Sequence, residues 1–378
     1  MAKSVGTRTL FDSKLYRTDI NRRNILSESR CVLDIKDFLA KMNSVPHVSG
    51  HEGELAQLIS AEFSKYAEVS IDKMGNLTAL KRGTGGGPKI MICAHMDEIG
   101  MMVATIEEGG FVKFSPIGGI DKRNILAQEV TIHGRQKVLG VIGIKPPHLT
   151  SPEDRKKAVD FFDMAIDTGY SKEKLEELIR PGDIITFVGD NFELKNNKLA
   201  GVALDDIAGV AAMQVALKNL EHYNHKADLY FVASVREEVH QYGGAKVATY
   251  NIEPDIGIAI DVTFGKAPGH DEYETFELGK GPVLSIGPGH TRKLFDSLKK
   301  VAASNKIPYQ VECAPTSGGT DAFAIQVGKG GVVTGLISIP LKYMHSTVEM
   351  LHLNDIEMCG KLVSDYVISL QSEGDKKC

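Results

Sequence analysis

The 378-residue chain has no tryptophan, no dense block of lysine and arginine, and no apolar run close to the length of a membrane span. A transmembrane helix needs about 20 apolar residues, so we expect no membrane partner. The net charge of -5 and the lack of a basic cluster argue against a nucleic-acid partner. With 42% hydrophobic and 25% charged residues, the composition predicts an ordinary globular protein.

Cysteine is scarce and scattered. The cysteines are odd in number, and no two have the spacing of a thiolate zinc site, so reduced thiols are expected. The first 33 residues are polar and lack the apolar core of a secretory signal. Both observations predict a cytoplasmic protein. The cysteines are Cys31, Cys93, Cys313, Cys359 and Cys378.

Segments with apolar residues at helical spacing alternate with short apolar runs through much of the chain. This alternation predicts an α/β domain. A helix is expected after Asp34, which is a good N-terminal cap. Further helices are expected over 55–66, 210–220, 294–301 and 355–370. Strands are expected over 69–71, 77–80, 90–95, 229–235, 256–260 and 332–339.

Between residues 100 and 188 the sequence pattern changes to short apolar runs separated by glycine and proline. One helix is expected after Ser171. This pattern is typical of a small β-barrel or sandwich. We therefore predict three parts: a polar N-terminal extension over 1–33, an α/β domain over 34–100 and 190–378, and an inserted β-rich domain over 101–189.

Polar side chains follow several of the predicted strands. His95 and Asp97 end the buried run at 90–95, and residues two apart in a strand point to the same face. Ligands of open α/β sheets bind at the carboxyl ends of strands. A single such pair is usually just hydrogen bonded, but similar side chains recur. They are Glu237 and Glu238 after 229–235, Asp261 after 256–260, His345 after 332–339, and Asp205 at the start of a predicted helix.

Two imidazoles and several carboxylates without cysteine suit zinc, cobalt or manganese. The number of ligands exceeds what one ion needs, which favours one carboxylate shared by two ions. Taken singly, Asp205-Asp206 would more often cap a helix, and Glu237-Glu238 would usually be a solvated pair. Thr320-Asp321, after two glycines, is expected to shape the floor of the site rather than to react.

Seven segments, in order along nearly the whole chain, carry a resemblance to one family. They are AHMDEIG at 94–100, IGIKPPHL at 142–149, ALDD at 203–206, EEV at 237–239, AIDVT at 259–263, SGGTDA at 317–322 and ISIPLKYMHS at 337–346. The chain resembles the dinuclear-metal aminopeptidases that include glutamyl and deblocking aminopeptidases and the tetrahedral (TET) peptidases. Some members of that family carry the label cellulase or endoglucanase. The resemblance implies a mixed-sheet α/β metallopeptidase domain with helices on both faces, plus an inserted barrel-like domain that pairs subunits.

The resemblance also implies a reaction: removal of N-terminal residues from peptides by a water or hydroxide that bridges two divalent metals. Zinc is the first expectation, and cobalt or manganese are also possible. Self-association into dimers, and of dimers into a dodecamer, is implied as well. The implied roles are Asp205 as bridging ligand, His95 and Asp261 on one metal, Glu238 and His345 on the other, Glu237 as general base, and Asp97 as the acid that orients His95.

Three positions depart from the family pattern, although none removes a ligand. They are Ile207 and Lys342, each where an arginine is usual, and His240-Gln241-Tyr242, where a glycine and a tighter loop are usual. Two other functions stay open at this point. A glycosidase would also use paired carboxylates, but it needs no histidines at strand ends and tends to carry aromatic sugar platforms. The second is an inactive assembly or binding protein. Loss of activity on treatment with a chelator would distinguish the aminopeptidase from such a protein.

Overall fold

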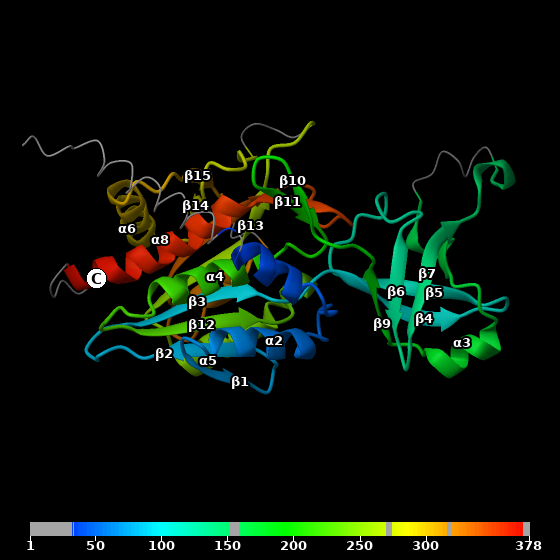
Figure 1. Ribbon diagram of the computed structural model, residues 1–378, viewed down its shortest axis with the longest axis horizontal. Coiled ribbons are helices and arrows are strands. Elements are labelled where there is room, and N and C mark those ends of the chain that lie inside the picture. Colours follow the sequence, from blue (N-terminus) through cyan, green and yellow to red (C-terminus); the bar gives the residue numbers. More distant parts are fainter. Residues whose placement is uncertain (1–31, 33, 152–158, 270–273, 316–318, 373–378) are drawn as a thin grey trace, which may run out of the picture.

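The computed structural model describes residues 32, 34–151, 159–269, 274–315 and 319–372, so the predicted extension over 1–33 lies outside the described residues except for Val32. An α/β body built on one large sheet lies beside a smaller β-barrel (Figure 1). No helix among these residues is long and apolar enough to cross a bilayer.

The large sheet is mixed and has eight strands. Its four central strands run parallel. β2 pairs antiparallel with β12, and β14 pairs antiparallel with β16 but parallel with β15. The central strands are buried on both faces, which explains their continuous apolar runs. In sheet order the strands are β1 (Glu68–Ile71), β2 (Leu77–Lys81), β12 (Asp228–Ser234), β3 (Lys89–His95), β13 (Ile256–Phe264), β16 (Val333–Leu341), β14 (Val283–Ile286) and β15 (Gln310–Cys313).

Helices cover both faces of this sheet. Alternate residues of β3 divide between two cores: Ile90 and Ile92 belong to the larger one, and Met91 and Cys93 belong to the smaller one. The larger core is covered by a helical segment over 34–42 and by α2 (Gly53–Phe63), α4 (Ile207–Asn219), α6 (Arg292–Ser304) and α8 (Leu353–Ser372). The smaller core is covered by α5 (Gly243–Ile252) and α7 (Asp321–Gln326).

The β-rich region forms a closed antiparallel barrel in the order β4-β5-β8-β7-β6-β9, with an apolar core of its own. The helix expected after Ser171 is α3 (Lys172–Leu178), whose first turn donates the Lys174 amide to the Ser171 hydroxyl. The strands are β4 (Gly100–Ile106), β5 (Phe111–Ile117), β6 (Glu129–His133), β7 (Lys137–Ile144), β8 (Met164–Asp167) and β9 (Ile184–Phe187). The predicted fold class, an α/β body with an inserted barrel, is confirmed.

The structure also contains a third sheet, of three short antiparallel strands, which was not predicted. Its strands are β10 (Phe192–Leu194), β11 (Lys198–Gly201) and β17 (Glu349–His352). Short helical turns occupy Pro147–Leu149 (η1) and Phe161–Asp163 (η3), and a π-helical turn, η4, occupies Glu237–Gln241. The third sheet matters because β17 begins with a carboxylate that contacts the candidate site.

Candidate active site

The parallel strands bring the predicted polar side chains to one edge of the sheet. His95 is the last residue of β3 and is level with Ser234, the last residue of β12. On the other side of β3, Ala259 of β13 pairs with Cys93, so Asp261 and His95 each lie two residues further along. The chain enters the barrel at Gly100, directly after this edge. The strand-end prediction therefore corresponds to a real cluster.

Asp205 lies at the centre of the cluster, and each of its carboxylate oxygens faces a different imidazole. Its Oδ1 is 3.1 Å from Nε2 of His95, and its Oδ2 is 3.4 Å from Nε2 of His345. Asp261 Oδ1 lies 3.9 Å from the same His95 nitrogen. Glu238 Oε2 lies 3.2 Å from the same His345 nitrogen. The five predicted ligands thus form two groups that share Asp205.

Sets of donor atoms within the cluster are close enough to hold a cation. Ligand atoms of His95, Asp205 and Glu238 all lie within 4.8 Å of one another, and those of His95, Asp206 and Asp261 do as well. Asp206 was not a predicted site residue. It caps α4 by accepting the Gly209 amide at 3.0 Å, while its other oxygen is buried without a hydrogen-bond partner.

The cluster is dominated by buried negative charge. Among the described residues, no lysine or arginine forms an ion pair with Asp205, Asp206, Glu237, Glu238 or Asp261. Burial, reinforced by Asp261, raises the pKa of Glu237 to about 10. Burial and the same aspartate also raise the pKa of Asp206 well above its ordinary value. Crowded buried carboxylates of this kind are stabilised by a cation.

The two imidazoles respond to this charge in the opposite direction. Burial alone would lower the pKa of His345, but Asp205 and Glu238 outweigh that effect and raise it to about 11. Burial opposes the ionisation of Asp205, yet hydrogen bonds from His345 and His95 hold its pKa below the ordinary value. Asp205 is therefore the carboxylate in the cluster that is most strongly stabilised in its charged form.

Asp97 lies beside His95, and its carboxylate also makes contacts that were not predicted. His95 Nδ1 is 3.0 Å from the main-chain oxygen of Asp97 and 3.6 Å from its carboxylate, which is too long for a hydrogen bond. The Asp97 carboxylate instead accepts the amides of Glu237 at 3.0 Å and Glu238 at 3.2 Å, and the Ser49 hydroxyl at 2.6 Å. Its side chain thus fixes the two glutamates, and its backbone orients His95.

The two glutamates lie on the π-helical turn η4, and their side chains diverge. This turn contains His240 and Gln241 of the departure from the family pattern. Two residues with left-handed backbone flank the turn, Arg236 with φ of 60° and Tyr242 with φ of 48°. Glu238 contacts His345, whereas the buried Oε1 of Glu237 has no hydrogen-bond partner. π-Helical turns occur frequently at functional sites. Both glutamates are buried at the cluster despite the departure.

Glu349 holds two ligand segments together and was missed by the sequence analysis. Its Oε2 accepts the amides of Leu204 at 2.8 Å and Asp205 at 3.1 Å, and its Oε1 accepts the amide of His345 at 3.0 Å. Burial and the charge of Asp205 raise the pKa of Glu349 to about 8. A single acidic residue at the start of a short strand carries no recognisable signal in the sequence.

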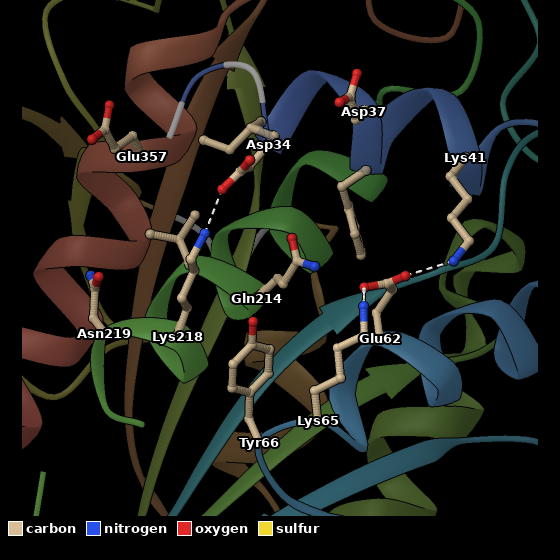
Figure 2. A pocket seen from close by; sticks show the side chains of 13 residues that line it. Asp34, Asp37, Lys41, Glu62, Lys65, Tyr66, Gln214, Lys218, Asn219 and Glu357 are labelled. Atoms are coloured by element: carbon tan, nitrogen blue, oxygen red, sulfur yellow. Dashed lines mark hydrogen bonds and ion pairs between the residues drawn. The ribbon is translucent and has the colours of Figure 1, made fainter. Parts of the chain in front are cut away.

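A cavity of about 770 Å³ lies elsewhere, between the 34–42 segment, α2, α4 and α8 (Figure 2). Two of its carboxylates already have basic partners: Asp34 is paired with Lys218, and Glu62 is paired with both Lys41 and Lys65. None of the predicted site residues lines it. Despite its size, we therefore place the candidate active site at the strand-end cluster, where two imidazoles and buried carboxylates without a lysine or arginine partner among the described residues converge.

Two other histidines have hydrogen-bond partners outside the cluster. His133 of the barrel lies 2.8 Å from the Thr186 hydroxyl, and His352 contacts the Asn354 amide. His270 lies outside the described residues. Asp321 is buried beneath the cluster, where the Ser234 hydroxyl donates to it, so it contributes to the floor as expected.

Comparison with known proteins gives the family. A family model described as M42 glutamyl aminopeptidase matches residues 75–362, a range that contains every predicted site residue. The chain belongs to the M42 glutamyl aminopeptidase family. It is thus a peptidase, and M42 peptidases are metallopeptidases, in agreement with a cluster of imidazoles and carboxylates.

Individual relatives support this assignment to the M42 family over nearly the whole length. A lysyl aminopeptidase of Pyrococcus furiosus is 38% identical over 86% of this chain and 94% of its own length. Aminopeptidase APDkam598 from the archaeon Desulfurococcus kamchatkensis has a TM-score of 0.84 at 36% identity, covering 91% and 99% of the two chains. The Pyrococcus horikoshii TET1 peptidase, which can assemble into a tetrahedron or a large octahedral shell, has a TM-score of 0.78 at 34% identity, covering 88% and 99%.

Proposed function

We propose that this M42 peptidase is a dinuclear metallo-aminopeptidase that removes N-terminal residues from peptides. The observation that carries the proposal is Asp205, whose two oxygens face two different imidazoles. His95, Asp205 and Asp261 would hold one divalent ion. Asp205, Glu238 and His345 would hold the other.

The residues present fit such ions in chemistry and in charge. Imidazole nitrogens and carboxylate oxygens suit zinc best, and they also accept cobalt or manganese. The unpartnered buried oxygens of Asp206 and Glu237 mark places where a cation or a water molecule would complete the hydrogen bonding. When bound, two such ions polarise a scissile carbonyl and acidify a water; aminopeptidases are a known example of two-metal sites.

Glu237 is the residue proposed to move the proton. Its carboxylate is buried in the cluster, and its Oε1 accepts no hydrogen bond from the described residues. Asp97 holds its amide, which fixes the side chain beside the ligands. Glu237 would accept a proton from the attacking water and then deliver it to the leaving amine, the usual sequence for a general base that becomes a general acid.

The preference for N-termini would follow from binding of the free α-amine of the substrate. This amine can bind one of the ions or an acidic side chain of the site, which would confine cleavage to N-termini. An acetylated N-terminus has no free amine. The described cysteines Cys93, Cys313 and Cys359 are free, which fits the reducing cytoplasm in which we place the enzyme.

The enzyme should hydrolyse aminoacyl fluorogenic substrates and short peptides with a free N-terminus, and it should leave N-acetylated versions intact. A chelator should abolish the activity, and added zinc, cobalt or manganese should restore it. Activity that survives complete metal removal would contradict the proposal. Release of reducing sugar from cellulose would favour the glycosidase, and an inert protein with bound metal would favour an assembly role.

We further propose that the barrel, which belongs to the inserted 101–189 domain, pairs two subunits, separately from the catalytic body formed by 34–100 and 190–378. Leu139 and Val141 on β7 and Phe162 beside the barrel are exposed apolar side chains in this domain, with Phe162 89% exposed. Exposed apolar side chains that gather on one domain are typical of an interface. The assembly of the P. horikoshii relative supports a homo-oligomer of dimers, and we propose a dodecamer.

Light scattering coupled to size-exclusion chromatography tests this assembly. We expect a mass twelve times the 41.1 kDa of one chain. Leu139→Asp should dissociate the particle, because a charge on β7 cannot be buried against a partner without a large cost. A monomer mass for the unmodified protein at micromolar concentration would refute pairing by the barrel, and a stable dimer would refute only the shell.

A further inference from the structure

Strand β13 continues past the metal cluster toward a second polar group. Asp261 belongs to the cluster, and Thr263 lies two residues further along the same strand. Alternate residues of a strand share a face, so Thr263 and Asp261 point to the same side of the sheet. The rise per residue places their Cα atoms roughly 7 Å apart.

Thr263 meets Glu312 of β15, and Glu312 in turn meets Ser285 of β14. The Thr263 hydroxyl lies 3.4 Å from Oε1 of Glu312, and the Ser285 hydroxyl donates to Oε2 at 2.7 Å. The first distance is long for a hydroxyl bond and the second is ordinary. Ser285 therefore anchors the carboxylate, while Oε1 keeps most of its capacity to accept another hydrogen bond.

The charge of Glu312 is not balanced within the part of the chain that the structure describes. Both of its hydroxyl partners are neutral, and no ion pair there joins it to a lysine, arginine or histidine. Glu312 is half-buried and Thr263 is buried, so solvent screens the carboxylate only in part. A carboxylate can accept about four hydrogen bonds, so Glu312 retains capacity for a cationic donor.

This position matches the reach of a cationic side chain. If the N-terminal residue of a peptide is held at the cluster by its amine and carbonyl, its side chain must extend away from the ligands. Lysine and arginine carry their charge at the end of long flexible stems. Thr263, two residues beyond Asp261, contacts Oε1 of Glu312, so a long stem that extends from the cluster along β13 is directed toward this carboxylate.

We propose that Glu312, anchored by Ser285 and flanked by Thr263, forms the side-chain subsite of this enzyme and selects peptides whose N-terminal residue is lysine or arginine. The inference rests on the proposed aminopeptidase function. It adds the substrate class, which is set by a carboxylate on a different strand from any of the metal-ligand candidates.

The test compares kcat/KM for lysyl, arginyl, norleucyl and leucyl fluorogenic substrates in zinc-supplemented buffer. Norleucine matches the lysine stem without its charge. Wild-type enzyme should prefer lysyl over norleucyl substrate, and Glu312→Gln should lower kcat/KM for lysyl and arginyl substrates by roughly 10- to 100-fold, the range for a hydrogen bond to a charged group. The loss should appear mainly in KM, and the neutral substrates should change by less than about twofold.

Glu277→Gln is the matched control. Glu277 is exposed and paired with Lys266, so its replacement removes the same charge without opening an unbalanced site. It should leave the lysyl preference unchanged. Because Glu312→Gln could misfold, inhibition of wild-type enzyme by free lysine and free norleucine gives a second measurement, and lysine should bind more tightly.

The outcomes separate the subsite from the parent function. Equal losses on all four substrates would assign Glu312 a structural role and overturn the subsite, as would equal lysyl and norleucyl rates in wild type. An enzyme that hydrolyses leucyl substrate but ignores lysyl substrate would overturn the subsite and leave the aminopeptidase intact. Absence of hydrolysis of every free-amine substrate would overturn the aminopeptidase, and the subsite with it.

Discussion

Glu237→Gln should lower kcat by roughly 10²- to 10⁴-fold, the usual contribution of a general acid-base residue, while the protein keeps its full metal content. Glutamine has the same shape but cannot accept the proton. The Glu237 side chain contacts neither imidazole in the ion pairs of the cluster, and its Oε1 has no partner among the described residues. Its replacement should therefore leave the ligand geometry intact.

Glu238→Gln is the matched control, because the two residues are adjacent and Asp97 holds both amides. Glu238 lies 3.2 Å from Nε2 of His345, in the second ligand group. Its variant should lose metal affinity as well as activity. Metal content measured by mass spectrometry beside kcat separates the two residues. Metal loss in Glu237→Gln with retention in Glu238→Gln would reverse their assignment.

Asp205→Asn should lose both ions rather than one, and activity with them. Asp205 is the residue that the two proposed metal sites share, and an amide gives up the charge that two imidazoles and two ions would share. Loss of an outer partner of a metal ligand typically costs 10- to 100-fold in affinity, so loss of a shared ligand should cost more. Titration with zinc and a competing fluorescent chelator measures both sites.

Asp190→Asn controls for removal of one negative charge, since Asp190 is exposed and belongs to neither ligand group. It should bind two ions and keep activity. If Asp205→Asn still bound two ions with unchanged affinity, Asp205 would not bridge. Loss of one ion only would make it a ligand of a single site.

Much of the cluster could be predicted because its residues directly follow apolar runs that are recognisable as buried strands. His95 ends an apolar run that is buried on both faces, and Asp261 follows the apolar residues 256–260 within β13, which continues to Phe264. Parallel strands bring such ends together, so residues separated by 166 positions could be expected to meet without knowledge of any contact. The resemblance to the family then implied which residues act as metal ligands and which as the general base, because the position of a residue after a strand does not distinguish these roles.

The supports of the cluster could not be predicted in the same way. Glu349 acts by accepting main-chain amides, among them that of Leu204, which lies 145 residues away in the sequence. Every residue except proline has such an amide, so no residue type signals the contact. The preference of the Asp97 carboxylate for the glutamate amides over His95 depends on differences of under 1 Å, which no spacing rule determines.

Short strands were missed for a related reason. β14 and β15 have four residues each, too few for a hydrophobic period to stand out. Their pairing nevertheless places Ser285 level with Glu312 and creates the acidic group near Asp261. The substrate preference that we infer is therefore a property of the tertiary structure, whereas the candidate metal ligands could be proposed from the sequence.

Anomalous X-ray diffraction from crystals grown with saturating zinc tests the two-metal centre most directly. We expect two peaks about 3.5–4 Å apart, the separation typical of two-metal sites. One should lie between His95, Asp205 and Asp261, and the other between Asp205, Glu238 and His345. A single peak at saturation, or two peaks that do not share Asp205, would contradict the proposed centre.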